Sequence, residues 1–197
     1  LSIKNIDAIY IPLPNSLCFN WIEKSLKKGI HVIVEKSMVT DLVQAKYLNK
    51  LAKNNKLILL ENFQFRFHKQ ISYIKEIIKN GEIGELRSLK SSFGFPPFKD
   101  PKNIRYSKVL GGGSLLDVGV YPIKIAQIFM GQNITIADAS LFYDQDRGID
   151  IWGGAYIKQI NGSMFSQISF GFDNFYQCNL EIWGSQGKVL AERIFTS

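Results

Sequence analysis

The sequence contains little cysteine and lacks the marks of several protein classes. Its 197 residues include two cysteines, Cys18 and Cys178, which lie far apart and have no metal-ligand spacing. We therefore expect no disulfide framework, no metal site and a reducing cytoplasm as the compartment. No apolar run reaches membrane-spanning length, and no basic segment followed by an apolar one opens the chain. These absences predict neither a membrane protein nor a secreted one.

A glycine loop of the kind that holds dinucleotide phosphates is also missing. No G-x-G-x-x-G motif stands between a strand and a helix, because GEIGE follows a helical pattern and GGGSLL has no strand before it. Dinucleotide-binding domains usually begin with a strand, such a turn and a helix. The chain also begins at Leu1 rather than at a methionine. We therefore expect the first strands of the domain to lie upstream of this chain.

Basic residues outnumber acidic ones by 24 to 17, which gives a net charge of +7. Surfaces that bind nucleic acid usually cluster their cations. Here the lysines are scattered over predicted helix faces, so we expect solvated surfaces and no nucleic-acid partner. The excess positive charge favours an anionic small ligand, such as a phosphorylated substrate.

Strand and helix patterns alternate through the first sixty residues. Strands are predicted at 6–12, 31–34 and 57–60, and helices at 16–28 and from a cap at Thr40 into the fifties. Short links between them imply parallel strands with right-handed crossovers. Because the strands are continuously apolar, we expect helices on both faces of this sheet.

The pattern changes after about Asn62. A helix is predicted at 70–80, a half-buried strand at 86–95, and a second helix from the glycines at 111–113 to about Met130. Alternating segments then run to the end of the chain, at 134–144, 149–160, 163–172 and 175–183, with a last strand after the turn at 184–187. Consecutive strands with short turns are typical of an antiparallel sheet with one open face.

The fold class is therefore α/β followed by α+β. Residues 1–62 are expected to form the C-terminal part of a Rossmann domain, a doubly wound parallel sheet. Residues 63–197 are expected to form a mostly antiparallel, open-faced sheet domain with helices on one face, which binds substrate and drives oligomerisation and is incomplete at its C-terminus.

Glu35 and Lys36 follow the apolar strand HVIV. Ligands of open α/β sheets bind outside the carboxyl ends of the strands. A lysine there can lie beside a nicotinamide and donate to a substrate oxygen. The alternative is an ordinary surface pair in a turn.

The segment GGGSLLDVGVYPI, residues 111–123, places Asp117 and Tyr121 four residues apart on one helix face. A carboxylate and a phenol on one face suit orientation of a substrate and proton transfer to a carbonyl. Gly119 leaves that side of the helix open to close contact. The alternative is a core tyrosine with an aspartate in the first helical turn.

The segment ENFQFRFH, residues 61–68, sets polar groups between aromatic ones directly after the third strand. His68 could act as a general base, but a lone histidine here more often begins a helix or packs. Arg66 is the better candidate for binding or for packing between domains.

The motifs IPLPN, GIHVIVEK, ENFQFRFH, GEIGELRS and GGGSLLDVGVYPI occur in this order. Together with the tail EIWGSQGKV, they resemble the glucose–fructose oxidoreductase/inositol dehydrogenase (Gfo/Idh/MocA) family through nearly the whole chain. SSFGFPP followed by IRY is similar to the nucleotide-sugar 3-ketoreductases of that family. Dihydrodiol, inositol and simple-sugar dehydrogenases share much of the pattern and remain alternatives. The family extends beyond both ends of this chain, so the resemblance implies truncation.

The resemblance implies an oxidoreductase that uses NAD or NADP, with NADP slightly favoured, and a sugar or nucleotide-sugar substrate. Tyr121 would pass a proton to the carbonyl oxygen, Lys36 would lower the pKa of the tyrosine and polarise that oxygen, and Asp117 would orient the sugar. The remaining residues implied at the cofactor are Pro12, Pro14, Asn15 and Glu35, and those implied at the substrate are Arg66, Arg105 and Tyr106.

Two positions depart from the family pattern. Ser37 replaces the proline that follows the lysine, and Cys18 replaces a histidine after the Pro-Asn pair. A non-enzymatic alternative, an inactive pseudo-enzyme or an oligomerisation module, therefore stays open. The family also implies a homodimer or homotetramer formed through the open sheet face. Aromatic residues expected on that face, or else in the core beneath it, are Phe165, Phe170, Phe172, Phe175, Tyr176 and Trp183.

Overall fold

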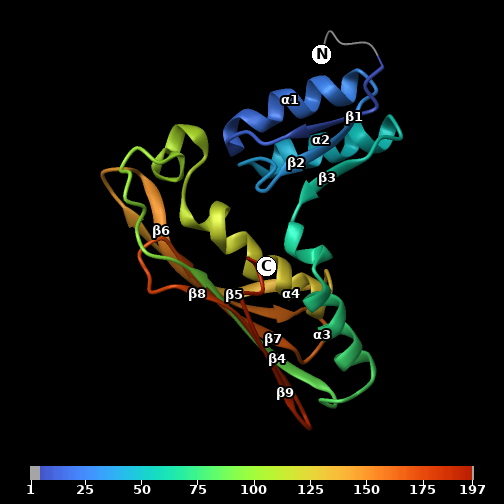
Figure 1. Cartoon of the computed structure of the whole chain (residues 1–197), viewed down its shortest axis with the longest axis vertical. Coiled ribbons are helices and arrows are strands. Elements are labelled where there is room, and N and C mark those ends of the chain that lie inside the picture. The colour runs from blue at the N-terminus through green and yellow to red at the C-terminus, as the bar shows by residue number, and fades with distance from the viewer. Residues whose placement is uncertain (1–4, 197) are drawn as a thin grey trace. The chain divides into compact units, whose positions relative to one another are not determined.

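A computed structural model describes residues 5–196 of the chain (Figure 1). The chain divides into two compact units. The first comprises Leu1–Phe63 and Lys102–Gly112, and the second comprises Gln64–Pro101 and Gly113–Ser197. The segment 102–112 is therefore an excursion of the chain that packs with the first unit.

The first unit is a three-stranded parallel sheet with two helices. Its elements are β1 (Ala8–Ile11), α1 (Asn15–Lys27), β2 (His31–Glu35), α2 (Leu42–Asn54) and β3 (Leu59–Asn62), with the short helices η2 (Ile104–Tyr106) and η3 (Lys108–Leu110) from the later segment. The strand order is β1-β2-β3, in parallel register throughout. Asp41, rather than the expected Thr40, caps α2, because its carboxylate accepts a hydrogen bond from the N–H of Gln44 at 3.0 Å.

Both helices of the first unit pack on the same face of its sheet. Val32 and Val34 of β2 form one buried core with Ile22 of α1 and Leu48 of α2. On the opposite face, Tyr10 is 53% exposed. The expectation of helices on both faces is thus wrong for the described residues. The strand order β1-β2-β3 makes both right-handed crossovers step in the same direction across the sheet, which puts both helices on one face.

The second unit is a six-stranded sheet with helices on one face. Its helical elements are η1 (Gln64–Phe67), α3 (Lys69–Lys79), the π-helical turn η4 (Leu115–Gly119) and α4 (Val120–Met130). Its strands are β4 (Leu86–Gly94), β5 (Ile134–Asp144), β6 (Ile149–Gln159), β7 (Phe165–Gly171), β8 (Gln177–Gly184) and β9 (Lys188–Glu192). The order is β5-β6-β7-β4-β8-β9, antiparallel except between β4 and β7.

Side chains of this sheet alternate between a helix-covered face and an outer face. Leu89 of β4, Ile168 of β7 and Leu180 of β8 are all buried, and η4 and α4 contact β4 and β7. Phe170 and Phe172 were expected on the open face or beneath it, and both are buried, at 4% and 0% exposure. Phe170 points inward because it shares the alternation of Ile168.

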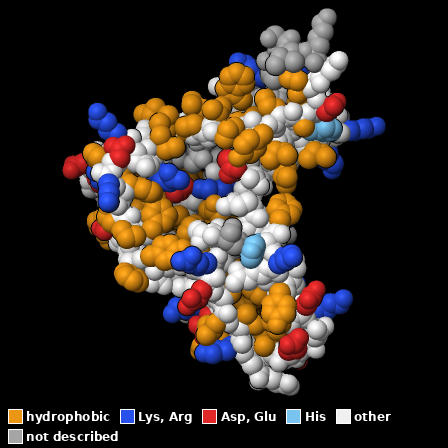
Figure 2. Space-filling model, viewed as in Figure 1, with side chains coloured by type: hydrophobic (Ala, Val, Ile, Leu, Met, Phe, Trp, Pro, Cys, Tyr) orange, Lys and Arg blue, Asp and Glu red, His pale blue; other side chains and the backbone are white. Residues whose placement is uncertain are grey.

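The helical run Lys108–Met130 is long and apolar enough, by length and composition, to cross a membrane. This is weak evidence, because core helices of soluble proteins have the same length and composition, and 44% of the apolar window is buried. The basic side chains on the face shown in Figure 2 are scattered among acidic and hydrophobic ones rather than gathered into one patch.

Candidate functional site

The turn after β2 begins with Lys36, and hydrogen bonds hold the two residues that follow it. The N–H of Ser37 donates to Oδ1 of Asn15 at 3.1 Å, and the N–H of Met38 donates to Oε1 of Glu61 at 2.8 Å. The Lys36–Ser37 peptide bond is cis. The backbone that presents Lys36 is therefore fixed by side chains from the start of α1 and from β3.

Asn15 joins this turn to the excursion at 102–112. Its Nδ2 donates to the backbone oxygen of Gly111 at 2.9 Å while its Oδ1 accepts from Ser37. One side chain thus fixes two loops at the carboxyl end of the parallel sheet, which is where open α/β sheets bind ligands. The family resemblance assigned Asn15 to the cofactor, and this connecting role within the first unit was not predicted.

Glu35 is the acceptor at the ends of all three strands. Its Oε1 accepts from the hydroxyl of Tyr10 at 2.6 Å and from Nδ2 of Asn62 at 2.8 Å. The hydrogen bond to Glu35 raises the pKa of the Tyr10 hydroxyl, with smaller contributions from desolvation and from the charge of that carboxylate. The side chain of Glu35 is thereby oriented beside the Lys36 turn.

The loop from β1 to α1 carries Pro12, which is exposed, and Pro14, which is half-buried and precedes the first residue of α1. Cys18, one turn into α1, is fully buried, and its thiol donates to the backbone oxygens of Leu13 at 3.4 Å and Pro14 at 3.5 Å. Burial raises the pKa of this thiol. Cys18 therefore secures the loop as a neutral packing residue, and both cysteines are free thiols.

Arg105 and Tyr106 lie in η2, within the first unit. Both are half-buried. Asn103 caps this short helix, with its Oδ1 accepting from the N–H of Arg105 at 3.0 Å. The structure therefore places these two substrate candidates in the same unit as Lys36.

In the second unit, Asp117 lies in the π-helical turn η4, and Tyr121 lies in the first turn of α4. Asp117 is half-buried, and Tyr121 is 7% exposed. The ring of Tyr121 packs against Phe93, Phe195 and Phe65, with centroid distances of 5.1, 5.5 and 5.6 Å. This aromatic cluster fixes the orientation of the phenol.

Gly119 lies between the two candidates, and its open side is used for packing. A Cβ there would approach the ring of Phe170 and the side chain of Leu115 to 3.1 Å. The close contact that the sequence suggested is therefore one between the helix and strand β7. Gly119 lets the helix lie close to the sheet.

Arg66 lies in η1, with its guanidinium 5.9 Å from the centroid of the Phe67 ring. His68 caps α3, because its Nδ1 accepts from the N–H of Gln70 at 3.2 Å. This agrees with a helix-entry role for His68. Within residues 5–196, no three His, Cys, Asp or Glu side chains come together as a metal site would require.

Sequence reasoning missed Asp150, which lies near the start of β6. Its Oδ2 accepts from the hydroxyl of Ser114 at 2.7 Å and from the N–H of Leu115 at 2.5 Å. An aspartate inside an alternating strand pattern gives no signal of such a contact, because its partners lie 36 and 35 residues earlier in the chain.

Comparisons with known proteins agree with both units. Residues 1–63 match the family model described as an oxidoreductase family with an NAD-binding Rossmann fold, and residues 71–190 match that of the GFO/IDH/MocA C-terminal domain. The chain is 40% identical over 196 residues to the dTDP-3,4-didehydro-2,6-dideoxy-alpha-D-glucose 3-reductase of Actinomadura kijaniata, covering 100% of this chain and 58% of that protein. It is 32% identical over 195 residues to D-xylose 1-dehydrogenase (NADP(+)) 2 of Haloferax volcanii, covering 99% and 59%.

Among solved structures, a 3-ketoreductase from A. kijaniata in complex with NADP and TDP-benzene matches with a TM-score of 0.92 at 38% identity. The match covers 98% of this chain and 59% of that protein. The chain thus spans less than two thirds of the length of these relatives. With both of its units matched by family models, the chain belongs to the Gfo/Idh/MocA oxidoreductase family.

Proposed function

We propose that this chain is the catalytic part of an NADP-dependent reductase that acts on a keto group of a nucleotide-linked deoxysugar. The observation that carries the proposal is the placement of Lys36 at the carboxyl end of a parallel strand in a chain 40% identical to a dTDP-sugar 3-reductase. The backbone directly after Lys36 is held by two hydrogen bonds to side chains, from the N–H of Ser37 to Asn15 and from the N–H of Met38 to Glu61.

The residues of the first unit fit the nicotinamide end of a dinucleotide better than its phosphates. The sequence has no glycine-rich turn between a strand and a helix, so it offers no cradle of backbone N–H groups for a pyrophosphate. At the carboxyl ends of β1 and β2, however, Pro12, Pro14, Asn15, Glu35 and Lys36 supply apolar contact, amide and charge. These five residues would hold the nicotinamide.

When bound, a reduced nicotinamide supplies the hydride that is added to the carbonyl carbon. As the C=O double bond becomes a single bond, the hydroxyl of Tyr121 gives its proton to the carbonyl oxygen. In this proposal the Lys36 ammonium stabilises the negative charge that develops on the oxygen. The product is an alcohol, and Tyr121 regains its proton from solvent.

Four residues are proposed to orient the substrate. Asp117 accepts a hydrogen bond from a sugar hydroxyl, and Arg66, Arg105 and Tyr106 take the rest of the nucleotide sugar. Arg105 suits a diphosphate, because a guanidinium binds phosphate oxygens in a bidentate manner. These assignments follow the family pattern and agree with the half-buried positions of Asp117, Arg105 and Tyr106.

The test needs a protein with a complete dinucleotide site. We define the completed enzyme as this chain joined to the segments of the A. kijaniata reductase that lie outside the match. Oxidation of NADPH is followed with a dTDP-linked 3-keto sugar, with free myo-inositol and with D-xylose and NADP+ in the reverse direction. Turnover of the dTDP-linked sugar alone is expected. Preference for a free polyol would favour the dehydrogenase alternative, and no turnover of any substrate would favour a pseudo-enzyme.

Calorimetry of the chain by itself measures how tightly it binds NADP+ without the segments outside the match. Without a phosphate cradle, the chain is expected to bind NADP+ at least a hundredfold more weakly than the completed enzyme, a difference of about 2.7 kcal/mol. Equal affinity would contradict the assignment of phosphate binding to segments outside the match.

A second copy of this chain is the proposed partner of the outer face of the six-stranded sheet. Alternation places both signs of charge on this face, with basic Lys90, Lys158 and Lys188 and acidic Asp138, Glu181 and Glu192. A face that carries both signs can pair with itself about a two-fold axis. Aromatic side chains also project there: Phe142 and Trp152 stack at a centroid distance of 3.8 Å, and Trp183 is 55% exposed.

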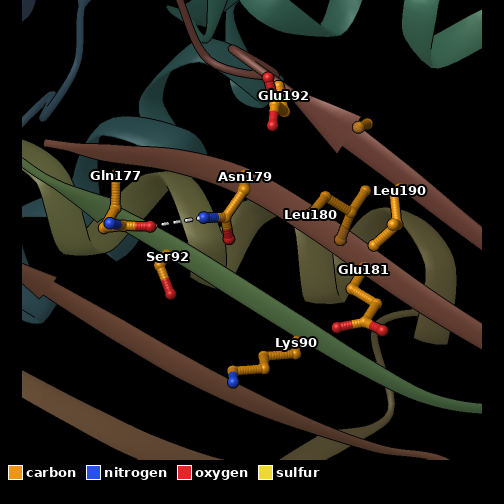
Figure 3. Close-up of a pocket in the computed structure, with 9 residues that line it drawn as sticks. Lys90, Ser92, Gln177, Asn179, Leu180, Glu181, Leu190 and Glu192 are labelled. Atoms are coloured by element: carbon orange, nitrogen blue, oxygen red, sulfur yellow. Dashed lines mark hydrogen bonds between the residues drawn. The ribbon is translucent and has the colours of Figure 1, made fainter.

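A hollow of about 360 Å³ lies on this face over β4, β8 and β9 (Figure 3). Lys90, Glu181 and Glu192 line it with Gln177 and Asn179, which hydrogen-bond to each other at 2.9 Å. Sedimentation of the chain is expected to give a dimer or tetramer, and Trp183→Glu is expected to give a monomer. Val109→Glu, at an 84% exposed position of the first unit, is the matched control. A monomeric wild-type chain would refute the interface.

Two free cysteines also fit the cytoplasm, which we propose as the compartment.

A further inference from the structure

Asp150 joins strand β6 to the start of the helix that carries Asp117 and Tyr121. Its Oδ2 accepts from the Ser114 hydroxyl at 2.7 Å and from the Leu115 N–H at 2.5 Å. Ser114 is fully buried. A single carboxylate oxygen therefore holds two successive residues of the turn that leads into η4.

The backbone of this turn is shaped around that carboxylate. Gly113 has a φ of +113°, a backbone conformation that residues other than glycine rarely adopt. A Cβ at this position would overlap with Oδ1 of Asp150. The backbone oxygen of Gly113 in turn accepts from the N–H of Asp117 at 3.2 Å. Asp150 is thus linked to Asp117 in three steps: its hydrogen bond to Ser114, the peptide bond from Ser114 to Gly113, and the hydrogen bond between Gly113 and Asp117.

A negative charge at this place also suits the helix. The first N–H groups of a helix have no partner within it, and the helix dipole favours an anion there. Ser114 makes no capping hydrogen bond of its own. The carboxylate of Asp150, on strand β6, supplies the anion at this position instead. The start of the helix is consequently fixed relative to β6 and β7, against which η4 packs.

We propose that Asp150 is a positioning residue for the reduction: it fixes the helix start so that Asp117 and Tyr121 meet the sugar in the reactive geometry. The proposal rests on the function proposed above for those two residues. Asp150 itself touches neither substrate nor cofactor in this scheme. Its effect passes through Leu115 and Gly113 to the turn of Asp117 and on to the first turn of α4.

The experiment compares four variants in the completed enzyme, each assayed well below its melting temperature. Asp150→Ala removes both hydrogen bonds, Asp150→Asn keeps an acceptor without the charge, and Ser114→Ala removes one donor. Asp144→Asn is the matched control, because Asp144 caps the turn between β5 and β6 by accepting from the N–H groups of Asp146 and Arg147, both at 3.0 Å. Amide exchange over 113–121 is measured in parallel on the chain alone.

For Asp150→Ala we expect kcat to fall between about tenfold and a hundredfold, the order produced when a reacting group is displaced by about 1 Å. The KM for NADPH stays unchanged, Asp150→Asn recovers part of the kcat, and Asp144→Asn retains wild-type kcat. In the chain alone, exchange over 113–121 rises at least tenfold for Asp150→Ala, while exchange in the β8–β9 hairpin is unchanged.

A kcat of Asp150→Ala within twofold of wild type would overturn the proposal, and so would an equal loss in Asp144→Asn. If the wild-type completed enzyme has no activity, the proposed function fails instead. The exchange measurement on the chain alone still tests the role of Asp150 in that case. Unchanged exchange over 113–121 in Asp150→Ala would show that Asp150 does not fix the helix start.

Discussion

Replacing Asn15 with alanine removes the side chain that joins the Lys36 turn to the excursion at 102–112. Two hydrogen bonds are lost, one from the Ser37 N–H and one to the Gly111 oxygen. Ser37 is 4% exposed, so loss of the acceptor for its N–H costs about 1–3 kcal/mol. The bond to Gly111 contributes about 1 kcal/mol more. We expect the free energy of unfolding of the first unit to fall by about 2–4 kcal/mol.

This loss of unfolding free energy is measured by urea denaturation, monitored through the amide exchange of peptides that cover residues 31–40. Asn15→Asp keeps the acceptor for Ser37 but loses the donor to Gly111, so it should lose less than Asn15→Ala. Asn49→Ala is the control: Asn49 donates to the Ala45 oxygen at 3.0 Å on the exposed side of α2, and alanine favours a helix. If Asn15→Ala and Asn49→Ala had equal stability, the hydrogen bonds of Asn15 would not hold the Lys36 turn.

Further predictions concern the second unit and the pH dependence of stability. Gly113→Ala should lower the free energy of unfolding by more than Gly131→Ala does. Both glycines have positive φ, but only at Gly113 would the Cβ meet other atoms, those of Asp150, and such overpacking costs about 1–3 kcal/mol. Thermal melts that give equal losses would contradict this. Hydrogen bonds from Lys27 and then Tyr47 hold the pKa of the Glu23 carboxyl below its usual value. The stability this contributes is present above the ordinary carboxyl pKa and lost as pH falls through the lowered one. The deficit of Glu23→Gln relative to wild type in denaturant titrations should therefore be largest at pH 7 and shrink as the solution is made acidic, and a deficit that does not change with pH would refute it.

The local elements of this chain could be predicted from its sequence because they depend on local periodicity. The strand predicted at 31–34 and the helix predicted at 16–28 are present in the structure as β2 and α1. Element ends were less predictable. The third strand begins at Leu59 rather than at Leu57, because Leu59 pairs with Val32 of the neighbouring strand.

Sheet order and side-chain contacts could not be predicted in the same way, because they join residues distant in the chain. Strand β4 lies between β7 and β8, and no pattern in 86–95 indicates that place. The same holds for the site. Lys36, Asp117 and Tyr121 could be proposed from motifs, whereas the hydrogen bonds of Asn15, Glu61 and Asp150 depend on tertiary structure.

The most direct test of the account is the turnover of Tyr121→Phe in the completed enzyme with a dTDP-linked 3-keto sugar and NADPH. The ring should remain packed against Phe65, Phe93 and Phe195, so the variant should fold as wild type does. Loss of a proton donor predicts a kcat lower by roughly a hundredfold or more. An unchanged kcat would contradict the assignment of Tyr121 as the residue that protonates the carbonyl oxygen.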